Sequence, residues 1–266
     1  MRARARPVTV QRVSGNHFTA GEFQVLDLAK DVDVVLMRQD PPFDIGYITA
    51  TYLLERIAGD TLVVNDPRSV RDAPEKLFVL DFAEFMPPTM ISRNLAEIRD
   101  FHSRHGEIVV KPLHGKAGEG VFRIGHDGTN LTALAELFGS VWKEPFIVQA
   151  YLPSVTEGDK RIVLVDGEVA GAINRRPKAG EFRSNLAAGG TAEQTELTPR
   201  EREICAAIGP ELKRRGLLFV GIDVIGGMMT EINVTSPTGI VAIDQFNGSD
   251  TPALIWHAIE AKVAAR

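Results

Sequence analysis

The chain has 266 residues, of which 44% are hydrophobic and 24% charged, with a formal net charge of −5. These values are typical of a soluble globular protein with one large domain or a few small ones. The acidic balance argues against a general nucleic-acid or membrane-surface binder. No apolar stretch is long enough to span a bilayer. The single cysteine, Cys205, excludes an internal disulfide framework and suits a reducing cytoplasm.

The first third of the sequence alternates strand and helix patterns. Residues 8–30 predict a short strand, a turn and a weakly patterned stretch; 32–37 predict a buried strand, 48–58 a helix and 61–64 another strand. This alternation is typical of a parallel α/β layer. The charged, proline-rich segment 38–44 follows the first buried strand, where such sheets bind ligands. The alternative is a proline-rich loop held by a salt bridge.

The middle of the chain predicts a glycine-rich connection between two strands. An amphipathic helix over 94–105 precedes a strand that ends near Lys111, and the loop 113–120 leads into a strand at 121–124. Because the loop joins strand to strand, neither the dinucleotide fingerprint nor the P-loop applies, since both need a following helix. Taken by itself, the loop would be interpreted as a glycine-rich turn of no special function. Because Lys111 directly precedes the loop and acidic residues follow downstream, a loop that covers phosphates is the better interpretation.

A long irregular loop separates a β-hairpin, which turns at residues 166–167, from the C-terminal third. Residues 174–190 are rich in glycine and basic residues and lack periodicity. A loop of this length predicts a mobile lid or a binding loop. An amphipathic helix follows over 199–215, with Cys205 on its inward face, and a helix over 251–265 closes the chain.

The C-terminal third contains a hairpin that carries acidic residues. A strand over 217–225 includes Asp223, two glycines break the pattern, and a strand over 228–234 carries Glu231 and Asn233. A buried carboxylate needs a charged partner or a metal. Oxygen ligands from these residue types suit a hard cation such as Mg²⁺. The alternative is a hairpin whose acids form structural ion pairs.

The turn of this hairpin decides whether Asp223 can join Glu231. Glu231 and Asn233 are two residues apart and therefore share one face of their strand. A plain two-residue turn would pair Asp223 with Thr230 and place it on the other face. An odd-length loop, or a bulge at a glycine, would bring Asp223 opposite Glu231. A metal site therefore predicts a three-residue connection or a bulge.

Several segments together resemble the bacterial glutathione synthetases of the ATP-grasp superfamily. They run in order from about residue 30 to the end of the chain: Leu36-Met-Arg-x-Asp-Pro-Pro-Phe-Asp44, Asp72-x-x-Glu-Lys-Leu-Phe78, Gly158-Asp-Lys-Arg161, Val165-Asp-Gly-Glu168, Asn185-Leu-Ala-Ala-Gly-Gly190, Phe219-Val-Gly-x-Asp-x-Ile-Gly226 and Thr230-Glu-Ile-Asn-Val-Thr-Ser-Pro-Thr238.

The resemblance implies an α/β (α+β) ATP-grasp fold in three parts. These are an N-terminal pre-ATP-grasp α/β domain over 1–71, an ATP-grasp lid subdomain over 72–153 and a C-terminal catalytic lobe over 154–266. Family members begin with a further strand–helix–strand unit ahead of the matched region. We therefore expect the N-terminal domain of this chain to be incomplete.

The resemblance also implies the residues of the site. ATP would contact Lys76, Lys111, Gly115, Gly118, Gly120, Gln149, Ala150, Tyr151, Leu152 and Asp159. Asp223, Glu231 and Asn233 would bind Mg²⁺ or Mn²⁺, and Arg161, Arg175 and Asn185 would act in catalysis. The substrate would contact Arg38, Asp40, Arg183 and Ser236.

The implied activity joins γ-glutamylcysteine and glycine, at the expense of ATP, into glutathione. The reaction would pass through an acyl phosphate, which a closed loop over 176–190 would protect from water. We expect a cytoplasmic homo-oligomer that binds small-molecule substrates and neither nucleic acid nor membranes. One alternative is another ATP-grasp amino-acid or peptide ligase. The other is a truncated nucleotide-binding module without turnover.

Overall fold

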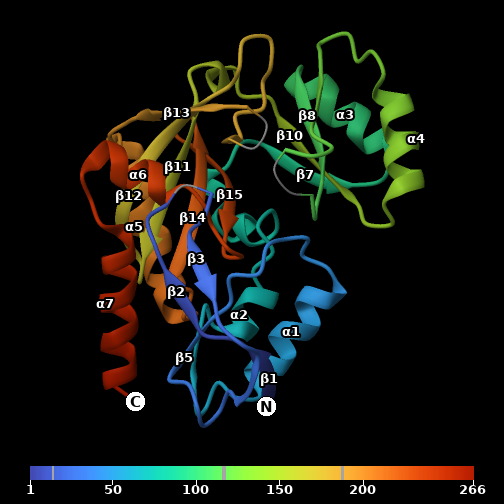
Figure 1. Cartoon of the computed structure of the whole chain (residues 1–266). Coiled ribbons are helices and arrows are strands. Elements are labelled where there is room, and N and C mark those ends of the chain that lie inside the picture. The colour runs from blue at the N-terminus through green and yellow to red at the C-terminus, as the bar shows by residue number, and fades with distance from the viewer. Residues whose placement is uncertain (14, 116–117, 187–188) are drawn as a thin grey trace.

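The computed structural model describes residues 1–13, 15–115, 118–186 and 189–266. A small four-stranded sheet with two helices lies above and beside a larger five-stranded sheet, and the N-terminal region lies at the bottom of Figure 1. The mixture of sheets and helices is the α/β class that the sequence predicts. Among the helices described, none is both long and apolar enough to cross a bilayer.

The N-terminal region is built on two short parallel strands, β5 (Val34–Leu36) and β6 (Leu62–Val64). Helix α1 (Ile45–Glu55) connects them, and α2 (Pro67–Arg71) follows β6. The parallel pairing confirms the predicted α/β layer. Helix α1 begins three residues earlier than the apolar pattern predicts because the Asp44 side chain caps it, accepting a hydrogen bond from the Tyr47 amide.

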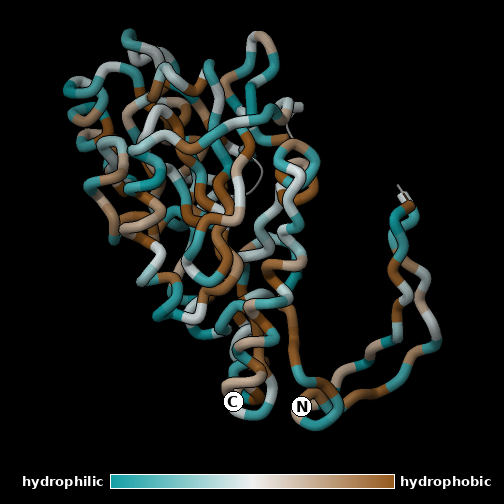
Figure 2. Tube along the Cα trace, turned by 90° about the vertical axis from the view of Figure 1, so that its left-hand side faces the viewer, coloured by the Kyte–Doolittle hydropathy of each residue, from teal (hydrophilic) through white to brown (hydrophobic). Residues whose placement is uncertain are grey.

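An antiparallel ribbon precedes this layer. Strand β1 (Arg2–Ala5) pairs with β4 (Gln24–Asp27), and β2 (Val8–Val10) pairs with β3 (Phe18–Ala20). Figure 2 shows the outer part of the ribbon reaching away from the rest of the molecule. The sequence predicted only one short strand here, because three- and four-residue strands with exposed side chains give almost no periodic signal.

The smaller sheet has its own core. Its antiparallel order is β7 (Thr89–Ser92), β10 (Phe146–Ala150), β8 (Ile108–Pro112) and β9 (Phe122–Ile124). Helices α3 (Leu95–His105) and α4 (Leu131–Val141) cover one face of it. Their apolar residues share one buried cluster with the strands, including Ile98, Phe101, Ile108, Phe138 and Phe146. The sheet therefore forms a unit that can carry Lys111 and the glycine-rich loop together.

The larger sheet is antiparallel throughout, and its central strands are buried on both faces. Its order is β13 (Thr191–Gln194), β12 (Glu168–Arg176), β11 (Asp159–Val165), β14 (Phe219–Ile225) and β15 (Met228–Asn233). Helices α5 (Pro199–Arg214), α6 (Ile240–Asn247) and α7 (Thr251–Ala264) complete this part, with the short 3₁₀ helices η1 (Phe78–Phe85) and η2 (Pro153–Thr156).

Alternate residues of these strands enter different cores. Ile162 and Ile222 join the cluster that contains Ile208 of α5, whereas Val163 joins the cluster that contains Ile255 of α7. This period of two is the geometry of a strand. Helix α5 carries Cys205 in its buried stripe, as predicted, and burial raises the pKa of that thiol to about 12.

Candidate active site

The hairpin of β14 and β15 brings the predicted metal residues onto one face. Asp223 pairs with Glu231, whereas the next residue, Val224, pairs with Met229. Thr230 is therefore the extra residue of a β-bulge. The connection at Gly226 and Gly227 has two residues, so it is the bulge that brings Asp223 opposite Glu231. The predicted bulge is confirmed, although it lies at Thr230 and not at a glycine.

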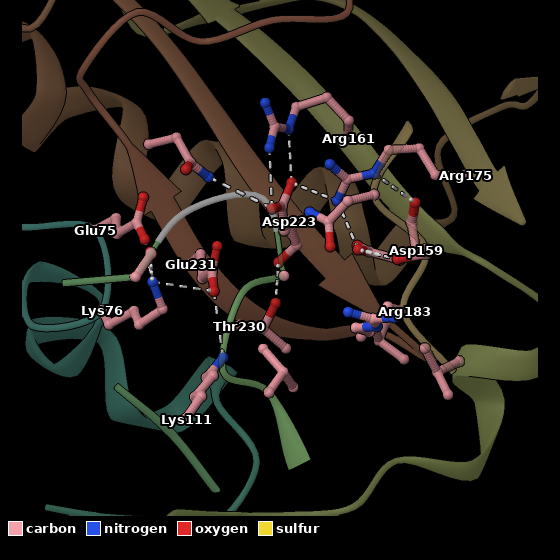
Figure 3. Close-up of a pocket in the computed structure, with 18 of the residues that line it drawn as sticks. Glu75, Lys76, Lys111, Asp159, Arg161, Arg175, Arg183, Asp223, Thr230 and Glu231 are labelled. Atoms are coloured by element: carbon pink, nitrogen blue, oxygen red, sulfur yellow. Dashed lines mark hydrogen bonds and ion pairs between the residues drawn. The ribbon is translucent and has the colours of Figure 1, made fainter. Parts of the chain in front are cut away.

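Two arginines from neighbouring strands hold Asp223. Arg161 donates from Nε to Oδ1 at 2.6 Å and from Nη2 to Oδ2 at 3.0 Å, and Arg175 donates from Nη2 to Oδ1 at 2.9 Å (Figure 3). All three side chains are buried. Burial alone would raise the pKa of Asp223, but the two guanidinium groups hold it well below its ordinary value. Asp223 is thus a stable carboxylate at neutral pH.

Asp159 lies at the other end of this charge network. Its Oδ2 accepts hydrogen bonds from Arg175 at 2.6 Å and from the Ser184 hydroxyl at 2.7 Å. Its Oδ1 is buried and has no hydrogen-bond partner among the described residues. Burial raises the pKa of Asp159 to about 6, although Arg175 opposes that shift. A buried acceptor left without a donor is suited to receive a hydroxyl group of a ligand.

Replacing Asp159 by asparagine should change how stability depends on pH. The folded-state pKa of about 6 lies above the ordinary value of 3.8, so the stability that this group contributes is complete below about pH 4 and is lost as the pH rises through 6. The parent should therefore lose stability relative to Asp159→Asn over that interval. Urea unfolding from pH 4 to pH 8 measures the difference, and parallel profiles for the two proteins would contradict the assignment.

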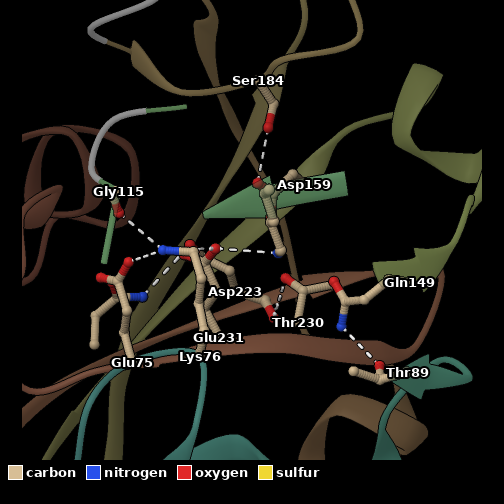
Figure 4. A network of polar contacts seen from close by, with 12 residues as sticks. Glu75, Lys76, Thr89, Gly115, Gln149, Asp159, Ser184, Asp223, Thr230 and Glu231 are labelled. Carbon is tan, nitrogen blue, oxygen red and sulfur yellow. Dashed lines mark hydrogen bonds and ion pairs between the residues drawn. The ribbon is translucent and has the colours of Figure 1, made fainter. Parts of the chain in front are cut away.

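Two lysines from separate parts of the chain converge on Glu231. Lys111 Nζ lies 3.3 Å from Oε1 of Glu231, and Lys76 Nζ lies 3.8 Å from the same atom. Lys76 also donates to the carbonyl of Gly115 at 2.8 Å and contacts the Glu75 carboxylate (Figure 4). Burial would lower the pKa of Lys76, but the carboxylates of Glu231 and Glu75 raise it above its ordinary value. Lys76 is therefore charged at neutral pH.

A cavity of about 540 Å³ contains these groups, a size typical of small-molecule sites. All the residues that the sequence predicted for the site line it, except Arg38 and Gly120: Asp40, Lys76, Lys111, Gly115, Gly118, Gln149, Ala150, Tyr151, Leu152, Asp159, Arg161, Arg175, Arg183, Asn185, Ser236, Asp223, Glu231 and Asn233. Residues that are almost 200 positions apart in sequence thus border one space.

Arg38 lies beside this cavity and supports its wall. Its Nη1 donates to the carbonyl of Pro237 at 3.1 Å, and its guanidinium carbon lies 5.1 Å from the centre of the Phe219 ring. The Ser236 hydroxyl donates to the Arg38 carbonyl at 3.3 Å. Asp40, two residues later, does line the cavity. Contact between Arg38 and a substrate stays a prediction.

The glycine-rich loop and the long 176–190 loop border the cavity together. Gly118 has a φ of +80°, and a Cβ atom there would lie 2.7 Å from Oδ1 of Asn185. The left-handed backbone favours glycine at this point, and a side chain there would also displace the Asn185 amide. Phe182, Arg183 and Leu186 of the long loop also line the cavity. Four residues of these two loops, which the sequence predicts to cover the site, lie outside the described residues: Lys116, Ala117, Ala187 and Ala188.

Glu75 and Ser184 are among the polar residues of the site that sequence reasoning missed. Glu75 lines the cavity beside Lys76, and burial, followed by the charge of Glu231, raises its pKa. Ser184 is buried and donates to Asp159. Both stand next to residues that were predicted, Lys76 and Asn185. Adjacency could have suggested them, but it cannot tell which of two neighbouring side chains faces a cavity.

The small sheet lies against a larger antiparallel sheet, and lysines, arginines and carboxylates of both parts line one cavity. This is the ATP-grasp fold, because an ATP-grasp domain model matches residues 75–248. Among solved structures it is similar to a D-cycloserine synthetase, with a TM-score of 0.69 and 20% identity over 90% of this chain and 86% of that one. It is also similar to D-alanine–D-alanine ligase from Bacillus anthracis complexed with ATP, with a TM-score of 0.64 and 18% identity over 89% and 82% of the two chains. At these identities the likeness concerns the fold.

The chain belongs to the prokaryotic glutathione synthetase family. The family's N-terminal domain matches residues 1–71, and its ATP-grasp domain matches residues 75–248. Glutathione synthetase of Rhodopseudomonas palustris is 57% identical over 98% of this chain and 83% of its own length. That of Shewanella oneidensis is 46% identical over 97% and 82%. The chain is therefore an enzyme, a C–N ligase that uses ATP and a divalent cation.

Proposed function

We propose that this chain joins γ-glutamylcysteine and glycine to give glutathione, ADP and phosphate. Membership of the glutathione synthetase family supports the choice of substrates. The convergence of Lys76 and Lys111 on Glu231, beside an aspartate held by two arginines, supports the use of ATP. A carboxylate is a poor acylating agent, so ATP first converts it to an acyl phosphate. The amine of glycine then attacks the acyl carbon, and phosphate leaves. The lysine and arginine side chains held around the transferring phosphoryl group stabilise its negative charge.

ATP is proposed to lie between the two sheets. Lys76 and Lys111 bind its phosphates, and the backbone at Gly115 and Gly118 covers them, with Gly120 behind them in the same loop. The adenine lies along residues 149–152, from Gln149 to Leu152. A ribose hydroxyl donates to Oδ1 of Asp159, an atom that otherwise lacks a donor among the described residues.

We propose that the divalent cation is Mg²⁺, or Mn²⁺ in its place, and that it is held by Asp223, Glu231 and Asn233. No group of three or more acidic, histidine or cysteine side chains is arranged to hold a metal within the described ranges. Two carboxylates, one amide oxygen and the phosphates of ATP would therefore form the ligand set, which suits a hard cation. Bound there, the metal would neutralise charge on the phosphates. A carboxylate has about four acceptor positions. In Asp223 three of them accept from Arg161 and Arg175, and the fourth, on Oδ2, accepts from the Asn233 amide at 3.5 Å. A cation would take this fourth position in place of the amide NH₂ group.

The remaining predicted residues are assigned to catalysis and to substrate binding. Arg161 and Arg175 stabilise the transferring phosphoryl group and the reacting carboxylate, and Asn185 closes over them from the 176–190 loop. Asp40, Arg183 and Ser236 contact γ-glutamylcysteine and glycine, with Arg38 supporting Ser236. The support for this assignment is that all of these residues except Arg38 border one cavity.

Substituting Ser184 by alanine should uncouple ATP use from product formation. The Ser184 hydroxyl fastens the 176–190 loop to Asp159, and without it water should reach the acyl phosphate more easily. We expect more phosphate released per glutathione formed, by about two- to tenfold, a range that corresponds to about 0.4–1.4 kcal/mol. Parallel assays of phosphate and glutathione measure the ratio. Ser140→Ala removes an exposed hydroxyl and should leave the ratio unchanged; equal ratios in both variants would exclude the anchoring role.

A set of incubations separates the proposed reaction from its alternatives. The protein is given Mg-ATP with γ-glutamylcysteine and glycine, or with other acyl acceptors, and glutathione, phosphate and bound ATP are measured. Glutathione and phosphate in equal amounts support the proposal. Phosphate release only with other acyl acceptors would favour another ATP-grasp amino-acid or peptide ligase. Binding of ATP without phosphate release dependent on a substrate would favour a nucleotide-binding module.

We also infer three domains, over 1–71, 72–153 and 154–266, and a cytoplasmic homo-oligomer without nucleic-acid or membrane partners.

Val10 and Phe18 support self-association, because they pair on one face of the protruding ribbon and are exposed. A two-stranded ribbon is marginally stable alone. Light scattering in solution measures the assembly, and a monomer at micromolar concentration would exclude it.

A further inference from the structure

A buried amide outside the cavity joins the N-terminal region to the open end of the acid hairpin. Asn65 directly follows β6 and is only 6% exposed. Its Nδ2 donates to the carbonyl of Phe219 at 2.8 Å and to the carbonyl of Val234 at 2.9 Å. Its Oδ1 accepts a hydrogen bond from the amide of Phe219, also at 2.8 Å. One side chain thus makes three buried hydrogen bonds across more than 150 residues of sequence.

These hydrogen bonds lie at the point where the two strands of the hairpin separate. The ladder between β14 and β15 ends at the pair Gly221 and Asn233. Beyond it, Phe219 continues along β11, opposite Val165, while the chain after Asn233 leaves the sheet. The Asn65 amide takes the place that β15 would have occupied beside Phe219, so the backbone groups there stay satisfied.

The segment released at this point forms part of the cavity. Asn233 is the residue just before Val234, and residues 235–239 line the cavity immediately after it. Arg38 holds the same segment through the carbonyl of Pro237. The N-terminal region therefore fixes both the beginning of this wall, through Asn65, and its middle, through Arg38.

We propose that Asn65 is a positioning residue for the cation site, which orients Asn233 by fixing the backbone of Val234. The proposal rests on the proposed function, because it takes Asn233 as a ligand of the cation. Groups that orient metal ligands typically change metal affinity 10- to 100-fold when they are removed. Among the described residues, the side-chain hydrogen bonds of Asn65 go to Phe219 and Val234 and not to the nucleotide residues or the acids, so its effect should be seen in metal binding.

The test compares Asn65→Ala and Asn65→Ser with Thr61→Val. Thr61 is fully buried just before the same strand and donates to the carbonyl of Leu28, with no contact to the hairpin among the described residues. Each variant therefore loses buried hydrogen bonds, but only the Asn65 variants lose those that hold Val234. Binding of Mn²⁺ is measured by electron paramagnetic resonance in the presence of a non-hydrolysable ATP analogue. Hydrogen exchange is followed over residues 230–239.

We expect Asn65→Ala to weaken Mn²⁺ binding at least about tenfold and to speed exchange over residues 230–239. Asn65→Ser, which keeps one donor, should lie between it and the parent, and carries the test if Asn65→Ala does not fold. Thr61→Val should bind Mn²⁺ like the parent. Unchanged Mn²⁺ affinity in a folded Asn65 variant overturns the proposal, whatever its stability. If Asn233→Ala also binds Mn²⁺ normally, the metal assignment fails as well.

Discussion

Replacing Glu231 by glutamine is expected to lower kcat by about 100- to 1,000-fold or more while leaving the fold intact. Glu231 carries the negative charge on which Lys76 and Lys111 converge, and it is a proposed ligand of the cation. Glutamine keeps the shape but removes the charge that fixes these groups around the phosphates, and loss of such preorganised electrostatics typically costs this much. Steady-state assays at rising Mg²⁺ concentration, together with a thermal melt, measure the effect.

The fold should survive this change because Lys76, the more deeply buried of the two lysines, retains other partners. Lys76 keeps its contacts with Glu75 and with the carbonyl of Gly115, so the loss of stability should stay within about 1–3 kcal/mol. Glu107→Gln provides the matched control, since Glu107 pairs with Arg123 on the surface of the smaller sheet and should be dispensable. Ordinary activity of Glu231→Gln at millimolar Mg²⁺ would refute the assignment.

Asp223→Asn should combine loss of activity with a large loss of stability. Asp223 accepts hydrogen bonds from Arg161 and Arg175, and all three side chains are buried. Asparagine removes the charge and sets an NH₂ group against a guanidinium, which leaves two buried cations with Asp159 as their nearby acid. Breaking such a buried pair typically costs about 3–5 kcal/mol. Chemical denaturation measures the change in the free energy of unfolding.

An exposed ion pair on the same sheet provides the comparison. Glu193 pairs with Arg176, and both side chains are more than a third exposed. Glu193→Gln should therefore change the free energy of unfolding very little and should leave turnover unchanged. If Asp223→Asn proves as stable as Glu193→Gln, the arginines do not depend on Asp223, and the charge network described above is wrong.

Most elements with a long, regular apolar pattern could be predicted from the sequence. Helix α3 begins one residue after the predicted start, where Asn94 caps it, and the strands of the acid hairpin lie where the pattern places them. Two kinds of element could not be predicted. The ribbon of β1 to β4 is too short and too exposed to produce a periodic signal, and α6 was missed altogether.

The residues of the site also fall into those that the sequence could predict and those that it could not. Residue types and spacing identified the carboxylates, the lysines and the two loops, because a hard cation and phosphates require those groups wherever they bind. Sequence could not place Arg38 outside the cavity wall or Glu75 and Ser184 inside it. Each of these positions depends on how one segment packs against another far away in the chain, which a local pattern does not contain.

By itself the sequence determined the family, the kind of chemistry and the condition that Asp223 must meet to face Glu231. Only the tertiary structure decided how that condition is met. A two-residue turn with a regular ladder would place Asp223 opposite Thr230, but the bulge at Thr230 shifts the register so that Asp223 lies opposite Glu231. Tertiary packing also brought Lys76, Lys111 and Asn65 to a hairpin more than 100 residues away. These contacts depend on tertiary structure because a buried charge or amide needs an ionic or hydrogen-bonding partner, and here the partners come from distant parts of the chain.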